Sequence, residues 1–164
     1  LNIFLTVGSD VPFDRFVRTV DQSLEDGKMP HRVFAQIGNS DYRPKNFEAV
    51  KFLSPSSFQE RLRACDVIVA HAGMGTILSA MKNKVPILVF PRHGSLGETR
   101  NEHQLATARQ LLKLGAVDVA FTEDELRSRL RELGTTQSRR QIPPHAPESF
   151  TGKLNTFLHR CGHS

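Results

Sequence analysis

The sequence predicts an α/β protein with a Rossmann-like, doubly wound parallel sheet of about six strands. Short runs rich in β-branched residues alternate with longer segments of helical periodicity, which is the order typical of βαβ units. The short runs are almost continuously apolar, as expected for strands covered on both faces. The chain has 164 residues, 38% of them hydrophobic, so one domain of this size can cover both faces of a modest sheet.

The predicted strands are six apolar segments, in chain order 3–7, 33–37, 49–53, 67–70, 87–90 and 117–121. The first helix is predicted after Pro12, because apolar side chains recur at helical spacing from Phe13 to Leu24. A second helix begins at Ser54 and Pro55, a capping residue followed by a first-turn proline.

Periodicity and end signals also mark the later helices. One follows the fourth strand and carries Ile77, and another has an apolar stripe from Leu105 and ends near Gly115. Thr122 and Glu125 form a capping box that opens the fifth helix.

We expect residues 1–133 to form the ligand-binding domain. The apolar pattern lapses over 134–147, which contains three prolines, so this segment is predicted to be an irregular linker. Residues 148–164 are predicted to form a C-terminal helix and tail that pack either on the domain or on a partner, since apolar side chains recur on one side of the helix.

Composition limits the class of protein. No run of about 20 apolar residues occurs, so we expect a soluble protein. Cys65 and Cys161 are far apart in sequence and do not form a disulfide framework, which favours a reducing, cytoplasmic compartment. The net charge is +5, with an arginine cluster that is either a solvated helix face or a surface for an anionic partner: Arg127, Arg129, Arg131, Arg139 and Arg140.

The strongest functional signal follows the fourth strand. His71 begins a turn that contains Gly73 and Gly75 and leads into a helix at Thr76. A helix N-terminus offers unpaired N–H groups and a positive dipole end, which suit a phosphate, and glycines let the backbone approach it closely. The alternative is that the glycines only form a tight turn between strand and helix.

Two other segments open at the same edge of the predicted sheet. Gly8 and Ser9 follow the first strand, where Asp10 or Ser9 can also act only as a helix cap. The loop 91–104 is dense in hydrogen-bonding side chains that suit sugar hydroxyls, although it can equally be a solvated loop. Its candidate residues are Glu98, His103 and Gln104.

Several ordered motifs resemble the C-terminal, donor-binding half of GT-B glycosyltransferases of family 28, from Leu1 to about Val119. The matching segments are 6–9, 71–76, 84–92, 97–98 and 103–104. The resemblance is closest to single-domain catalytic subunits of two-chain enzymes, those of bacterial exopolysaccharide assembly and of the eukaryotic dolichol-linked UDP-GlcNAc transferase.

The resemblance implies roles for the candidate residues. His71, Gly73, Gly75 and Thr76 would hold the UDP diphosphate, Gly8 and Ser9 would line the cleft, and His103 and Gln104 would reach the donor sugar. Related enzymes usually place a ribose-binding glutamate where this chain has Ser79, and Glu98 is the substitute we consider. No Asp-x-Asp motif occurs, so we expect no cofactor and no required metal.

The resemblance further implies an inverting UDP-sugar transferase that acts on a lipid-linked acceptor. The acceptor-binding domain of a GT-B enzyme has no counterpart here, so a membrane-anchored partner subunit would supply it and recruit the chain to the cytoplasmic face of a membrane. No residue of this chain is assigned as the catalytic base. The alternative is a noncatalytic, nucleotide-binding subunit of the same fold, which Ser79 favours.

Three other functions are disfavoured. Gly73 and Gly75 lack the third glycine of a dinucleotide fingerprint, which argues against NAD. The arginines lack interleaved aromatic side chains, so we expect no nucleic-acid partner. His159, Cys161 and His163 have no second ligand pair, so they are not expected to bind metal.

Overall fold

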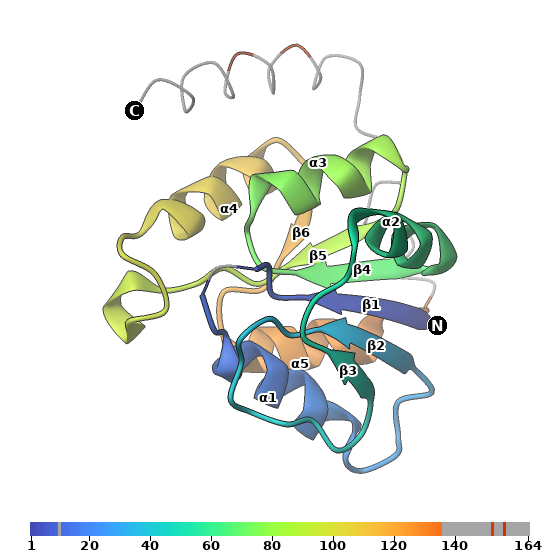
Figure 1. Ribbon diagram of the computed structural model, residues 1–164. Helices are drawn as coiled ribbons and strands as arrows, with labels where there is room; N and C mark the ends of the chain where they lie inside the picture. Colours follow the sequence, from blue (N-terminus) through green and yellow to red (C-terminus); the bar gives the residue numbers. More distant parts are fainter. Residues whose placement is uncertain (10, 136–151, 153–155, 157–164) are drawn as a thin grey trace.

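The computed structural model describes residues 1–9 and 11–135, together with Gly152 and Thr156. Six parallel strands form one sheet in the order β3-β2-β1-β4-β5-β6, which confirms the doubly wound prediction (Figure 1). The strands are β1 (Asn2–Thr6), β2 (Arg32–Gln36), β3 (Glu48–Val50), β4 (Val67–Ala70), β5 (Ile87–Val89) and β6 (Asp118–Val119).

The register of the sheet aligns the carboxyl ends of its three central strands. Thr6 of β1 pairs with Ala70 of β4, and Ala70 pairs with Val89 of β5. The strand order also reverses between β1 and β4, the position at which doubly wound sheets open a crevice for ligands. The loops after these three strands therefore begin side by side at the point where a ligand site is expected.

Helices cover both faces of the sheet (Figure 1). Helices α1 (Asp14–Leu24) and α5 (Glu123–Glu132) pack on one face, and α2 (Pro55–Ala64), α3 (Met74–Lys82) and α4 (His103–Lys113) pack on the other. A short 3₁₀ helix, η1 (Gly94–Leu96), lies between β5 and α4. Each face has its own apolar cluster, with Phe16 of α1 in one and Ile77 of α3 in the other.

Two of the predicted helix starts are confirmed by their capping hydrogen bonds. Ser54 accepts a hydrogen bond from the Ser57 N–H at 3.2 Å, with Pro55 in the first turn of α2. Thr122 accepts from the Glu125 N–H at 3.2 Å at the start of α5. Such caps satisfy N–H groups that have no acceptor inside the helix.

The third and sixth strands are shorter than predicted, because side chains bind the backbone beyond their ends. The Leu53 N–H donates to Gln36 Oε1 at 3.1 Å instead of to a neighbouring strand. The Phe121 N–H donates to the Glu125 carboxylate at 2.7 Å. Both segments were predicted as strands from their apolar composition, which does not reveal these competing acceptors.

The predicted linker (134–147) and C-terminal segment (148–164) lie almost wholly outside the described residues. Among the helices that the structure describes, none combines the length and hydrophobicity needed to cross a membrane.

Candidate functional site

A cleft of about 460 Å³ opens at the carboxyl edge of the sheet, where the loops after β1, β4 and β5 meet. Seven of the nine predicted site residues line it, and the lining residues are Val7, Gly8, Ser9, Val11, His71, Gly73, Gly75, Thr76, Arg92, Thr99 and Gln104. A larger cavity of about 730 Å³ lies at the opposite edge, beside residues that precede β1 and β2, and contains none of the nine. The smaller cleft is therefore the candidate site, because ligands of such sheets bind at the carboxyl edge.

The amino end of α3 forms one wall of the cleft. Gly73 is its N-cap and has no side chain that could cap the helix. The N–H groups of Met74, Gly75 and Thr76 occupy the first turn, where a helix provides no acceptor. Together with the positive end of the helix dipole, they can bind an anion at the mouth of the cleft.

The glycines around His71 differ in what surrounds them. A Cβ atom on Gly73 would overlap His71 Nε2, and one on Gly8 would lie 2.8 Å from His71 Cε1. A Cβ atom on Gly75 would meet no atom within 4 Å. Gly8 and Gly73 therefore make room for the imidazole, and only Gly75 leaves open space beside the helix N-terminus.

The Gly8 turn requires glycine for a second reason. Its φ of 81° lies in the left-handed region, which is strained for other residues. Its N–H lies 3.4 Å from Thr6 Oγ1, and its carbonyl would lie 3.0 Å from a Cβ atom on Gly38. The first and second βα loops are thus packed tightly against each other at the edge of the cleft.

Gln104, in the first turn of α4, also lines the cleft. Its Oε1 atom accepts a hydrogen bond from the Arg92 N–H at 3.0 Å, which assigns the orientation of the amide. The Nε2 group is consequently the part of this side chain that can donate to a ligand.

Four residues that line the cleft were not predicted as site residues, namely Val7, Val11, Arg92 and Thr99, and Arg92 is the charged one among them. Its side chain lines the cleft although the residue is only 4% exposed. The sequence did contain a signal for Arg92. Arginine is rarely buried, yet this arginine directly follows a strand predicted to be buried and a proline.

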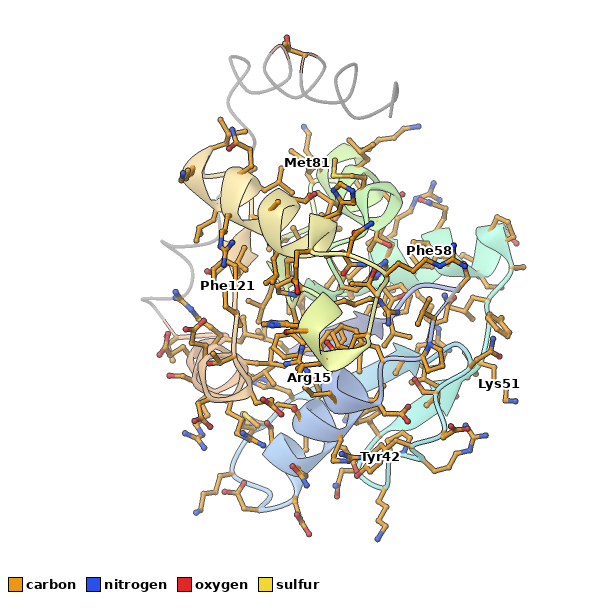
Figure 2. All side chains as sticks on the ribbon, turned by 90° about the vertical axis from the view of Figure 1, so that its left-hand side faces the viewer. Arg15, Tyr42, Lys51, Phe58, Met81 and Phe121 are labelled. Atoms are coloured by element: carbon orange, nitrogen blue, oxygen red, sulfur yellow. The ribbon has the colours of Figure 1, made fainter. Side chains whose placement is uncertain are left out.

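Glu98 and His103 do not line the cleft. Both Glu98 carboxylate oxygens bind Arg15 of α1, at 2.6 and 2.8 Å, and one also accepts from the His93 N–H at 2.9 Å. Arg15 lies between α1 and the η1 segment (Figure 2). His103 is exposed at the start of α4, where its N–H donates to Asn101 Oδ1 at 3.1 Å.

Within residues 1–9 and 11–135, no group of three or more metal-ligating side chains could hold a metal ion. His159, Cys161 and His163 lie outside the described residues. Burial raises the pKa of the Cys65 thiol to about 11, so this cysteine is protonated at neutral pH and is a poor nucleophile.

Residues 2–156 match a family model described as the glycosyltransferase family 28 C-terminal domain. A relative in Mus musculus, the UDP-N-acetylglucosamine transferase subunit ALG13, is 31% identical over 122 residues. This match covers 68% of the present chain but only 10% of the mouse protein, so the chain spans about a tenth of that relative.

Solved structures share the fold. MurG of Acinetobacter baumannii superposes with a TM-score of 0.65 at 19% identity, covering 95% of this chain and 48% of that one. An NMR structure of ALG13 superposes with a TM-score of 0.60 at 18% identity, covering 96% of this chain and 94% of that one. The structural neighbours include GT-B glycosyltransferases, and the chain corresponds to about half of such an enzyme.

Proposed function

This chain belongs to the glycosyltransferase family 28 C-terminal domains, and from that membership we propose that it is the donor-binding catalytic subunit of an inverting UDP-sugar transferase. One observation carries the proposal. The amino end of α3, whose N-cap Gly73 has no capping side chain, opens into a cleft that the Gly8 turn and Gln104 also line. This arrangement offers anion-binding and sugar-binding groups within one cleft.

The diphosphate of the donor would bind at the first turn of α3. The N–H groups of Gly75 and Thr76, the Thr76 hydroxyl and the His71 ring are donors for its oxygens. Negative charge builds up on this diphosphate as the bond between the donor sugar and the diphosphate breaks. Hydrogen-bond donors that are fixed in advance therefore stabilise the transition state more than the ground state. No metal is required for this form of leaving-group stabilisation.

The donor sugar would contact Gln104, whose amide group is oriented by the backbone of Arg92. An acceptor hydroxyl attacks the anomeric carbon from the face opposite UDP. The new carbon–oxygen bond forms as the bond to the diphosphate breaks, the electron pair leaves with UDP, and the hydroxyl proton passes to a base. The configuration at the anomeric carbon is inverted.

We assign the acceptor and the base to a second protein. The mouse relative is named as a subunit of a UDP-N-acetylglucosamine transferase, which supports a partner subunit. In this proposal a membrane-anchored partner holds a lipid-linked acceptor over the cleft, at the cytoplasmic face of a membrane, in polysaccharide or lipid-linked oligosaccharide assembly.

Calorimetry with UDP and UDP-sugars tests donor binding, and a transfer assay with the reconstituted partner tests catalysis. The proposal predicts saturable binding by the chain alone and transfer only after the partner is added. The absence of UDP binding would contradict the proposal.

One residue favours a second candidate function, a noncatalytic nucleotide-binding subunit. Ser79 stands where related enzymes usually have a ribose-binding glutamate, and it is not among the residues that line the cleft. UDP binding without transfer in any reconstituted pair would favour this candidate.

A further inference from the structure

Arg92 forms hydrogen bonds to two segments that line the cleft, the loop after β1 and the first turn of α4. Its guanidinium donates hydrogen bonds to the carbonyls of Val7, Val11 and Pro12, at 2.7, 2.5 and 2.7 Å. These carbonyls belong to the loop after β1, the loop that presents Gly8 to the cleft. The guanidinium also lies over the Phe13 ring, 4.6 Å from its centroid.

The backbone of the same residue acts on the other side. The Arg92 N–H holds Gln104 Oε1 at 3.0 Å, and a guanidinium nitrogen lies 3.4 Å from the Glu98 carbonyl. Residue 92 therefore contacts both the loop that carries Gly8 and the side chain that is predicted to reach the donor sugar.

We propose that Arg92 is a positioning residue, which holds the backbone of Val7, Val11 and Pro12 so that Gly8 is already in place at the cleft when the nucleotide binds. This inference rests on the proposed function. A planar guanidinium with several N–H groups can reach three carbonyls that converge from one loop, whereas a lysine ammonium is a single nitrogen with three donors. Arginine and lysine are consequently not equivalent at this position.

A partly buried ion pair between Arg15 and Glu98 supports the loop that carries Arg92. Arg15 binds both carboxylate oxygens of Glu98, and its guanidinium lies over the Phe90 ring at 4.4 Å. Glu98 in turn holds the N–H of His93, the residue after Arg92. Glu98 thus acts through the loop that carries Arg92, which gives this carboxylate a task other than contact with ribose.

The test compares the wild type with Arg92→Lys and with the control Arg61→Lys. Arg61 also stacks on an aromatic ring, Phe34 at 3.6 Å, but lies on α2 outside the cleft. Amide hydrogen exchange is measured on the ligand-free proteins, and UDP affinity is measured by calorimetry.

We expect Arg92→Lys to raise amide exchange at Gly8, Ser9 and Val11 by about tenfold or more while exchange in β4 and α3 stays unchanged. UDP affinity is expected to fall by about tenfold, and Arg61→Lys is expected to change neither quantity. Unchanged exchange at Gly8, Ser9 and Val11, or a uniform rise across the whole sheet, would overturn the proposal.

The exchange measurement needs no ligand, so it tests the positioning role even if UDP does not bind and the proposed function fails. If Arg92→Lys does not fold, NMR of the wild type decides. Guanidinium hydrogens held by three carbonyls give resolved, slowly exchanging signals, and fully averaged Arg92 signals would contradict the assignment.

Discussion

Gly73 and Gly75 stand two residues apart, yet the structure gives them different tasks. A Cβ atom on Gly73 would collide with the His71 ring, whereas one on Gly75 would extend into open space beside the helix N-terminus. The sequence predicted both as glycines that let a phosphate approach. Of the two glycines, the structure shows open space only beside Gly75, where the prediction still stands, whereas Gly73 makes room for the His71 ring.

Gly75→Ala is therefore expected to separate stability from binding. Alanine in a helix stabilises the fold by up to about 1 kcal/mol relative to glycine. The added methyl group would occupy space next to the predicted phosphate, so UDP affinity is expected to fall by about tenfold or more. Urea denaturation and calorimetry measure the two effects.

Gly73→Ala is the matched control. It overpacks the His71 ring and is expected to lower the free energy of unfolding by about 1–3 kcal/mol. Unchanged UDP affinity in Gly75→Ala would argue against a phosphate at this turn.

Gln104 provides a second prediction at the level of single residues. Gln104→Glu keeps an oxygen for the Arg92 N–H but replaces the donor group with a carboxylate oxygen. The extra affinity for a UDP-sugar over UDP is expected to disappear, because a carboxylate cannot donate to a sugar hydroxyl. Gln110→Glu adds the same charge to an exposed position of α4 and should leave this difference intact when both are measured by calorimetry.

At the level of elements, hydrogen bonds to the Asp21 carboxylate connect α1 to the segment between β2 and β3. This carboxylate is 2% exposed and accepts hydrogen bonds from the Tyr42 hydroxyl at 2.8 Å, the Lys45 N–H at 3.0 Å and the Asn46 N–H at 2.8 Å. Tyr42 lies beside α1 (Figure 2). Sequence periodicity placed α1 correctly but gave no indication of this contact.

Asp21→Asn is expected to lower the free energy of unfolding by about 2 kcal/mol, because a charged acceptor of several buried hydrogen bonds is lost. The hydrogen bond to Asp21 also raises the pKa of Tyr42. Tyr42 is the one tyrosine of the chain, so its ultraviolet absorbance titrates it alone.

In the Asp21→Asn variant the Tyr42 titration should shift to lower pH, and in the exposed control Asp26→Asn it should not move. A Tyr42 titration that is identical in wild type and Asp21→Asn would disprove the contact.

Asp118 of β6 makes the free energy of unfolding depend on pH. Burial raises the pKa of this carboxyl, partly opposed by Arg129, whose guanidinium lies 3.6 Å away. The folded protein therefore binds the Asp118 proton more tightly than the unfolded chain does. Above the raised pKa, ionisation of Asp118 lowers the free energy of unfolding. This loss disappears as the pH falls through the raised pKa.

Asp118→Asn carries no such titration. The free energy of unfolding of the wild type, relative to that of this variant, is expected to increase as the pH falls from about 7 to about 4. The same comparison with the exposed control Asp124→Asn should show no such increase. Urea denaturation at several pH values measures these free energies. A relative stability that rises with pH instead would reverse the assigned direction.

For the whole molecule, the sequence was sufficient to predict the order of elements, the parallel sheet and most of the cleft. Apolar runs and helical periodicity are local signals, and parallel strands place their carboxyl ends at one edge by topology. Gly8, His71, Thr76 and Gln104 could be predicted to converge for that reason.

Contacts between distant side chains could not be predicted in this way. Arg15 and Glu98 are 83 residues apart in sequence and meet only after α1 and the loop after β5 pack together. Arg92 reaches Val7 across 85 residues for the same reason. Glu98 was considered as a ribose ligand because an isolated sequence does not show which partner occupies a carboxylate.

The proposed function depends on where a nucleotide diphosphate binds, and a crystal structure of the chain with UDP tests this most directly. We predict phosphate oxygens within hydrogen-bonding distance of the Gly75 and Thr76 N–H groups, with the remainder of the nucleotide along the cleft. UDP bound in the cavity at the amino edge of the sheet, next to Leu1 and His31, would contradict it.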